Sequence, residues 1–350
     1  MFLSGLATAV PPRSYTQPEC WDALQRADRP ELDARTRATL RGILTHDNGI
    51  ERRSLALDTL DEGFALDPDT LHKRFATHAP RLAAQAGRRA LEAAAVPAER
   101  IDAVVVSTCT GYLCPGLTSY VAESLALRHD ALPLDLVGQG CGAALPNLRT
   151  AEALLASGGA GAVLSICVEV CSAAMYLDQD LGVLVSACLF GDGAAAAVLT
   201  PGHEGSGRRV RWVDAESATE PKLRDALRFE TRAGRLRNIL TLPVPRLAAE
   251  HARMVFDAAA ARARFGPEEI STWVMHAGGR RVLEEVRGAL DLDEEDLRYS
   301  AAVLRDFGNL SSPFVLFVLD RALREAEGGL WWMSSFGAGF SCHGALLEVA

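Results

Sequence analysis

The residues best suited to chemistry in this sequence are a cysteine, a histidine and an asparagine that lie far apart in the chain. Cys141 stands in GQGCG, directly before a segment predicted to be a helix. A thiol at a helix N-terminus faces the positive end of the helix dipole and N–H groups without partners, which lowers the thiol pKa and favours the thiolate. Cys141 is therefore interpreted as a nucleophile. The other seven cysteines are expected to be small buried apolar residues: Cys20, Cys109, Cys114, Cys167, Cys171, Cys188 and Cys342.

His276 and Asn309 each have two interpretations that the residues alone leave open. His276 ends the apolar segment STWVMH, and strand ends in α/β sheets are common places for sites. A histidine there can accept a thiol proton and stay charged beside the thiolate, or it can be a hydrogen-bonded core residue. Asn309 begins another predicted helix. It can be an ordinary N-cap, or its NH₂ group can stabilise a developing oxyanion.

The elements that must position these side chains alternate between helix and strand. Helices are predicted over residues 82–95, 119–127 and 141–157, and strands over 101–111, 131–138 and 160–170. This alternation predicts the α/β class.

The second half of the chain repeats the first. VPAERIDAVVVSTCTG (96–111) resembles FGPEEISTWVMHAGG (265–279), and GQGCGAALPNL (138–148) resembles DFGNLSSPFVL (306–316). Ile101 lies 40 residues before Cys141, and Ile270 lies 39 before Asn309. We therefore predict two similar halves, 1–205 and 206–350, that meet in the Gly-rich segment 201–209. If the halves face each other, Cys141 lies opposite Asn309 and His276.

Composition narrows the functional classes. The chain has 350 residues, of which 49% are hydrophobic and 23% charged, which is typical of a globular protein. A net charge of −9 disfavours a nucleic-acid partner, and no apolar run is long enough for a membrane helix. Eight cysteines without disulfide density or an export signal favour the cytoplasm. The cysteine pairs 109/114 and 167/171 lack zinc-site spacing and a nearby histidine, so no metal is expected.

Taken together, the motifs resemble the chalcone-synthase-like (type III) polyketide synthases of the bacterial type, within the thiolase superfamily. The motifs are STCTGYLCPG (107–116), GQGC (138–141), FGDGAAA (190–196), HAGG (276–279), GNLSSP (308–313) and FGAGFS (336–341). The resemblance spans roughly residues 40–350. It implies a homodimer in which each subunit has a five-layered αβαβα fold, with malonyl-CoA and an acyl-CoA starter as substrates and with no metal or redox cofactor.

The resemblance also assigns roles by motif. Cys141 would carry the acyl group, and His276 with Asn309 would stabilise malonyl thioester as it loses CO₂. Six further residues would contact substrate. Phe190 would be the aromatic between tunnel and cavity, Arg52 and Arg53 would meet CoA phosphates, and Ser311 would lie in the site. Cys114 would reach towards the partner subunit's cavity, and Arg246 would replace a cavity-lining glycine.

Two other functions stay open. A single-round condensing enzyme of fatty-acid initiation shares the cysteine, histidine and asparagine, although HAGG differs from the HQAN usual there. A non-catalytic thiolase-fold subunit is the other alternative, although such proteins typically lose the nucleophile. The starter, the number of extensions and the mode of ring closure depend on cavity shape, which the sequence does not reveal.

Overall fold

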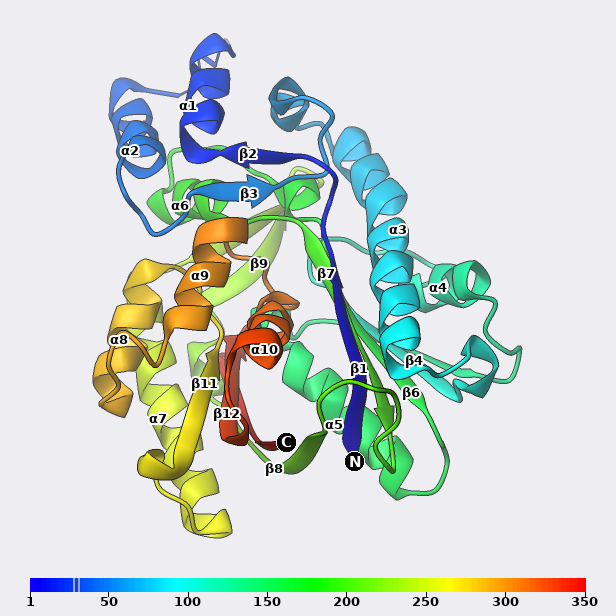
Figure 1. The fold of residues 1–350 in the computed structure, drawn as a ribbon. Helices are drawn as coiled ribbons and strands as arrows, with labels where there is room; N and C mark the ends of the chain where they lie inside the picture. The colour runs from blue at the N-terminus through cyan, green and yellow to red at the C-terminus, as the bar shows by residue number, and fades with distance from the viewer. Residues whose placement is uncertain (28, 31) are drawn as a thin grey trace.

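The computed structural model describes residues 1–27, 29–30 and 32–350 of the chain, and it has the predicted α/β class (Figure 1). The strands are β1 (Phe2–Ala9), β2 (Ser14–Thr16), β3 (Arg52–Ser54), β4 (Ala103–Ser107), β5 (Leu132–Leu136), β6 (Val163–Glu169), β7 (Gly193–Thr200), β8 (Val210–Thr219), β9 (Leu227–Arg232), β10 (Arg235–Leu240), β11 (Ile270–Met275), β12 (Gly329–Gly337) and β13 (Ser341–Val349). The α-helices are α1 (Gln17–Arg26), α2 (Ala34–Thr45), α3 (Pro68–Ala94), α4 (Leu117–Leu125), α5 (Ala144–Ala156), α6 (Leu181–Leu189), α7 (Val244–Ala263), α8 (Arg280–Leu290), α9 (Arg298–Phe307) and α10 (Phe314–Glu325).

The main sheet consists of two similar portions. Its strand order is β11-β12-β13-β8-β1-β7-β6-β4-β5. In the first half, β4 and β6 are parallel, and β6, β7 and β1 follow as antiparallel neighbours. In the second half, β11 and β12 are parallel, and β12, β13 and β8 follow in the same way. The structure thus confirms the internal repeat, with β4 corresponding to β11 and β6 to β12. The two portions join where β1 pairs with β8.

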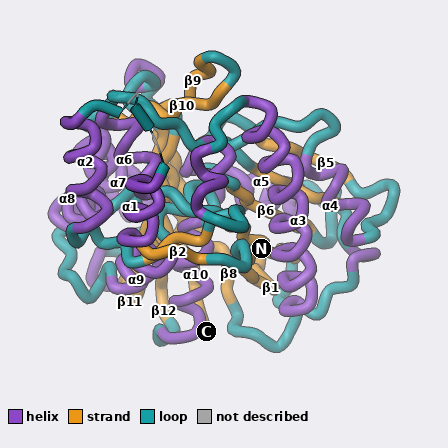
Figure 2. Tube along the Cα trace, turned by 90° about the horizontal axis from the view of Figure 1, so that it is seen from above, coloured by secondary structure: helices purple, strands orange, loops and turns teal. Residues whose placement is uncertain are grey.

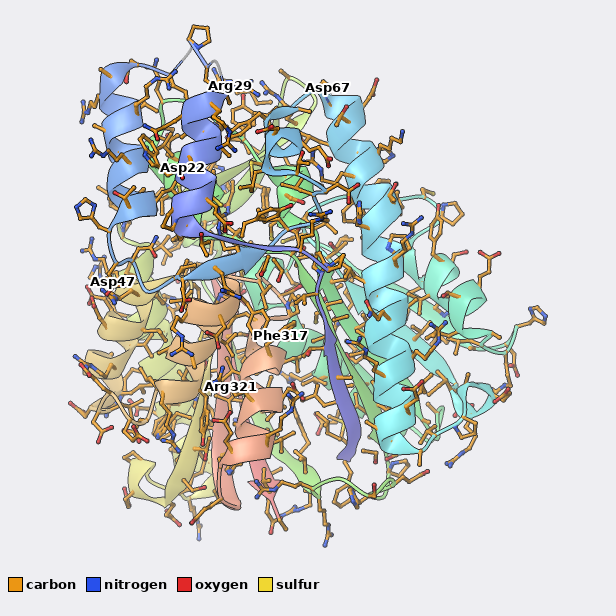
Figure 3. The ribbon with its side chains drawn as sticks, turned by 45° about the horizontal axis from the view of Figure 1, so that its top comes forward. Asp22, Arg29, Asp47, Asp67, Phe317 and Arg321 are labelled. Atoms are coloured by element: carbon orange, nitrogen blue, oxygen red, sulfur yellow. The ribbon has the colours of Figure 1, made fainter. Side chains whose placement is uncertain are left out.

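Helices form the other three layers of the five-layered fold. The long helix α3 covers one face of the first portion, and α7 lies against β8, β12 and β13 of the second. Helices α5 and α10 lie between the two portions, since each contacts strands of both. Figure 3 shows Phe317 on this central helix α10. The layers follow from the sequence pattern, because the apolar strands Val104–Val106 and Val163–Val168 are buried on both faces.

The alanine-rich pattern of α3 has a packing reason. A Cβ atom on Gly5 of β1 would lie 2.3 Å from the carbonyl oxygen of Ala90 in α3. Strand and helix are therefore in backbone contact, and small residues on both sides permit this close approach.

The strand predicted over 131–138 is confirmed as β5, which lies at the edge of the sheet, where Leu132 and Val137 are exposed. One predicted helix begins later than expected. The helix predicted to begin at Cys141 begins at Ala144, and Cys141 lies in a 3-10 turn, Gly140–Gly142. Among the residues described, no helix combines the length and apolar composition that crossing a bilayer requires.

Candidate active site

The loop that carries Cys141 is held tightly against the second half of the molecule. Gly140 has a positive φ of 58°, and a Cβ atom there would lie 3.0 Å from the backbone nitrogen of Ala338. A Cβ atom on Gly142 would lie 3.2 Å from the backbone nitrogen of Gly337. The glycines around Cys141 therefore permit close packing against the end of β12.

The thiol of Cys141 does not have the low pKa that the sequence predicted. Burial raises the pKa of this thiol to about 12, and the Ser311 hydroxyl, which donates a hydrogen bond to Sγ at 3.2 Å, opposes the rise. The predicted helix dipole has less effect because the cysteine precedes α5 and is not its first residue. A thiolate at this position therefore needs a partner that can take the proton and remain nearby as a cation.

Asn309 is linked to Cys141 through Ser311. The side-chain oxygen of Asn309 accepts a hydrogen bond from the Ser311 N–H at 2.8 Å, and Ser311 in turn contacts Cys141. Ser311 has a φ of +59°, a left-handed conformation that costs free energy for a residue other than glycine. The Asn309 side chain holds Ser311 in this conformation, with its hydroxyl directed at the sulfur of Cys141. The Asn309 NH₂ group donates to the carbonyl oxygen of Gly278 over a longer distance, 3.3 Å.

His276 directly follows β11, as predicted, and its imidazole is in apolar surroundings. The ring lies edge-on against Phe314 and Phe336, with centroid distances of 5.1 and 5.0 Å. Burial lowers the pKa of His276 to about 3. Both ring nitrogens are buried and have no hydrogen-bond partner among the described residues. Buried polar atoms are nearly always hydrogen-bonded, so two unpartnered nitrogens indicate a position for a substrate group or for a proton.

The three side chains border one region of the molecule. Phe336 contacts the His276 ring, and its carbonyl carbon would lie 3.2 Å from a Cβ atom on Gly142, the residue after Cys141. Asn309 also borders this region, because its NH₂ group donates a hydrogen bond to the carbonyl oxygen of Gly278, two residues after His276. The fold thus brings the loop of Cys141 to two segments that follow it by more than 130 residues in the sequence.

Glu169, which the sequence analysis did not select, lies next to the site and is fully buried at the end of β6. Its carboxyl group accepts hydrogen bonds from the Ser312 hydroxyl at 2.6 Å, the Thr110 hydroxyl at 2.8 Å and the Cys109 N–H at 3.0 Å. Burial raises the pKa of Glu169, and these donors lower it. A carboxyl group in the otherwise apolar segment AVLSICVEV was the sequence signal that could have identified it.

Phe190 and Ser311 line the same small cavity of about 30 Å³, which also borders Tyr176 and Asn238. Phe190 follows α6 and pairs with Asn309 in an isolated β-bridge. The backbone of Phe190 is therefore fixed to that of a candidate site residue, and its side chain borders a cavity.

Arg53 does not lie at a tunnel mouth. Only 3% of it is exposed, and its guanidinium donates to the carbonyl oxygens of Ala187 and Phe190, both at 2.9 Å, and to Gln17 Oε1 at 3.1 Å. It satisfies carbonyl groups at the C-terminal end of α6 and holds the backbone of Phe190. This internal role corrects the expectation that Arg53 meets CoA phosphates.

The remaining predicted contact residues lie at the surface. Arg52 and Cys114 are exposed, and the exposure of Cys114 corrects the expectation that it is a buried apolar residue. The Arg246 side chain is 61% exposed and pairs with Glu250 one turn along α7. Arg246 therefore points away from the cavities, because its position in the first turn of α7 directs it outward.

Comparisons with known proteins cover nearly the whole chain. A family model described as chalcone and stilbene synthases, N-terminal domain, matches residues 3–203, and the corresponding C-terminal domain matches 235–348. The chain is 30% identical to a 3,5-dihydroxyphenylacetyl-CoA synthase of Streptomyces toyocaensis, over 98% of this chain and 89% of the relative. It is 32% identical to a 1,3,6,8-tetrahydroxynaphthalene synthase of Streptomyces peucetius subsp. caesius, over 99% and 92%.

A solved structure extends the comparison to the fold. The crystal structure of 1,3,6,8-tetrahydroxynaphthalene synthase from Streptomyces coelicolor A3(2), a bacterial type III polyketide synthase, superposes with a TM-score of 0.89. The two chains are 25% identical, and the match covers 99% of each.

Proposed function

Because this chain belongs to the chalcone and stilbene synthase family of type III polyketide synthases, we propose that Cys141, His276 and Asn309 are its catalytic residues. The protein is an acyltransferase. It condenses malonyl-CoA repeatedly onto a CoA-linked starter and cyclises the chain that results. Its relatives make a dihydroxyphenylacetyl-CoA, a tetrahydroxynaphthalene and α-pyrones, and we propose an aromatic or pyrone product of this kind.

In the first step the Cys141 sulfur attacks the thioester carbonyl of the starter, and the CoA sulfur leaves and takes up the proton that Cys141 had given to His276. Burial opposes charge on both the Cys141 thiol and the His276 imidazole, so neither group ionises readily alone. When the proton moves from the thiol to the imidazole, each new charge stabilises the other. The Ser311 hydroxyl adds a hydrogen bond to the sulfur.

In the second step malonyl thioester loses CO₂, and the electron pair of the broken C–C bond moves towards the thioester oxygen. Hydrogen bonds to this oxygen lower the barrier most, because negative charge develops there. The N–H of the unpartnered His276 imidazole and the NH₂ group of Asn309 are the donors we propose. The enolate carbon then attacks the acyl carbonyl on Cys141, the bond between that carbon and the Cys141 sulfur breaks, and Cys141 leaves as a thiolate. Decarboxylation supplies the carbanion, so we propose that no metal or redox cofactor takes part.

We propose that the CoA phosphates bind in a groove of about 720 Å³ and that Arg53, which is buried, does not contact them. Arg280, Arg298 and Arg305 line it, and Arg280 follows directly after the HAGG segment that ends at Gly279. Arg280 pairs with Asp47, but both side chains are substantially exposed, and a solvent-exposed pair of this kind contributes little stability. A phosphate could therefore replace Asp47 at small cost.

We also propose a cytoplasmic homodimer that forms through the edge strand β5. β5 pairs with β4 on one side, and its other side has no strand partner among the described residues. Tyr112, Leu132 and Val137 are 70%, 45% and 62% exposed beside this edge. A second copy that covered the edge would satisfy its backbone groups and bury these side chains. The eight free cysteines agree with a reducing compartment.

The observation that carries the proposal is the buried, unpartnered imidazole of His276 beside the loop of Cys141. The test is to incubate the protein with labelled starter-CoA and malonyl-CoA and to measure label on the protein and product mass. We expect label on Cys141 and products longer by several C₂ units, both lost in Cys141→Ala. Label retained in that variant would contradict the assignment, and a single added C₂ unit would contradict iteration.

A further inference from the structure

A cavity much larger than the one that Phe190 and Ser311 line adjoins the loop of Cys141. The proposed function assigns it no ligand. Its volume is about 750 Å³, and its lining includes Gly140, the residue before Cys141, and Cys109. The sulfur of Cys109 lies 3.4 Å from the Ser311 hydroxyl that also contacts Cys141. One end of this cavity therefore lies next to the proposed nucleophile.

Part of the lining comes from the β9–β10 hairpin, which lies at the margin of the molecule (Figure 2). Three arginines line the cavity, Arg224, Arg228 and Arg235, while the described lining contains a single carboxylate, Asp225. The chain as a whole has a net charge of −9, so this excess of positive charge is local. Arg228 pairs with Asp225 and Glu230, so the excess comes from Arg224 and Arg235. An excess of one sign of charge in a cavity concentrates ligands of the opposite sign.

Among these three arginines, Arg235 is the one best positioned to bind an anion. Its guanidinium lies over the ring of Tyr176, 4.4 Å from the centroid, and it contacts the Tyr176 hydroxyl at 3.4 Å. No carboxylate of the described chain pairs with it. By contrast, Arg237 on the same strand pairs with three carboxylates. Stacking on an aromatic ring fixes the plane of a guanidinium and leaves its forked N–H donors free for a carboxylate.

Arg235 is also placed where a chain that grows from Cys141 would extend. Tyr176, on which it stacks, lines the small cavity with Ser311 and Phe190. Phe229 and Thr110 border both cavities and separate them. An acyl chain that passes from the nucleophile into the larger cavity thus enters a space that Arg235 lines.

We propose that Arg235 binds the terminal carboxylate of an acyl group held on Cys141, so that the enzyme favours dicarboxylic acyl-CoA starters over apolar ones. The inference rests on the proposed function, since it takes Cys141 as the acylated residue. A CoA phosphate offers the same anionic oxygens to a guanidinium, so the experiment must separate the two sources.

The test measures acylation of Cys141 by intact-protein mass spectrometry with glutaryl-CoA and with pentanoyl-CoA. These acyl groups have the same number of carbons, and only the first ends in a carboxylate. In Arg235→Gln we expect kcat/KM for loading of the glutaryl group to fall about ten- to a hundredfold, the usual range for a lost charge-assisted hydrogen bond. Loading of the pentanoyl group should change less than about twofold, and Arg235→Lys should recover part of the loss.

Arg232→Gln is the matched control, because Arg232 is on the same hairpin and exposed but does not line the cavity. It removes the same charge without the contact. An equal fall for both acyl groups in Arg235→Gln would mean that Arg235 binds CoA phosphate, and would overturn the proposal. So would an unchanged preference, or a wild-type preference for the pentanoyl group. Failure of both acyl groups to load on Cys141 in the wild type would instead contradict the proposed function.

Discussion

The two halves of this molecule build the same strand–loop–helix unit around opposite electrostatic surroundings. Cys141, in the loop before α5 of the first half, is near the Ser311 hydroxyl, the Cys109 thiol and the carboxyl group of Glu169, and of these Ser311 comes from the second half. His276, directly after β11 of the second half, is instead surrounded by the rings of Phe314 in α10 and Phe336 in β12. The sulfur of Cys141 receives a hydrogen bond, whereas the imidazole of His276 has no hydrogen-bond partner among the described residues.

This difference shows how one duplicated framework can supply both members of a proton-transfer pair. An imidazole without hydrogen-bond partners has no neighbour that competes for a proton from Cys141. A thiol that receives a hydrogen bond from Ser311 has a stabilised anion once the proton has left. Neither half would achieve this alone, because burial keeps each group neutral in isolation.

The strongest test of the comparison removes the imidazole. We expect His276→Ala to lower condensation about a thousandfold or more, since both a proton acceptor and an oxyanion donor are lost. The pKa of Cys141 would then stay near the raised value of about 12, so its thiolate would be scarce at neutral pH and would increase as pH rises.

Alkylation of Cys141 by iodoacetamide measures this directly. In His276→Ala the rate should rise about tenfold per pH unit between pH 7 and 10, because only the thiolate reacts. The wild type should react faster at pH 7, and the gap should narrow towards pH 12. The exposed His129→Ala is the control. Equal rates for the wild type and His276→Ala at pH 7 would mean that His276 does not accept the proton of Cys141, and would contradict the proposed proton transfer.

Asn309 tests whether the second half contributes a donor or only holds Ser311 in place. Asn309→Ala should lower kcat about a hundredfold, the usual cost of losing one oxyanion donor. Asn309→Asp keeps an oxygen for the Ser311 N–H but lacks the NH₂ group. Steady-state kinetics should show a similar loss in both variants. Near-normal activity of Asn309→Asp would assign Asn309 to positioning alone.

Glu169 sharpens the description of the first half. A negative charge on this carboxyl group raises the pKa of Cys141, so Glu169→Gln should lower that pKa. In the His276→Ala background, we expect alkylation of Cys141 at pH 8 to become about two- to tenfold faster. The exposed Glu123→Gln is the matched control. A slower reaction in Glu169→Gln would mean that the pKa of Cys141 had risen. The hydrogen bonds that Glu169 makes would then affect this pKa more than its charge does.

The smallest effect is expected at Arg246. Arg246→Ala removes one exposed ion pair with Glu250, which contributes about 0–1 kcal/mol to stability. Activity and product profile should stay within about twofold of wild type. A changed product on mass analysis would mean that this side chain reaches a cavity after all.

The sequence alone determined the class of fold, the internal repeat and the candidate residues Cys141, His276 and Asn309. These depend on local patterns, such as apolar strand runs, glycines and the residue before a helix, which are visible along the chain. Tertiary structure decided the burial of Arg53, the outward direction of Arg246 and the contacts of Glu169. It also raised the pKa of Cys141, which the helix-terminus argument had predicted to fall. The reason is that burial and charge balance are set by segments far apart in the sequence, such as 108–110 and 311–312 around Glu169.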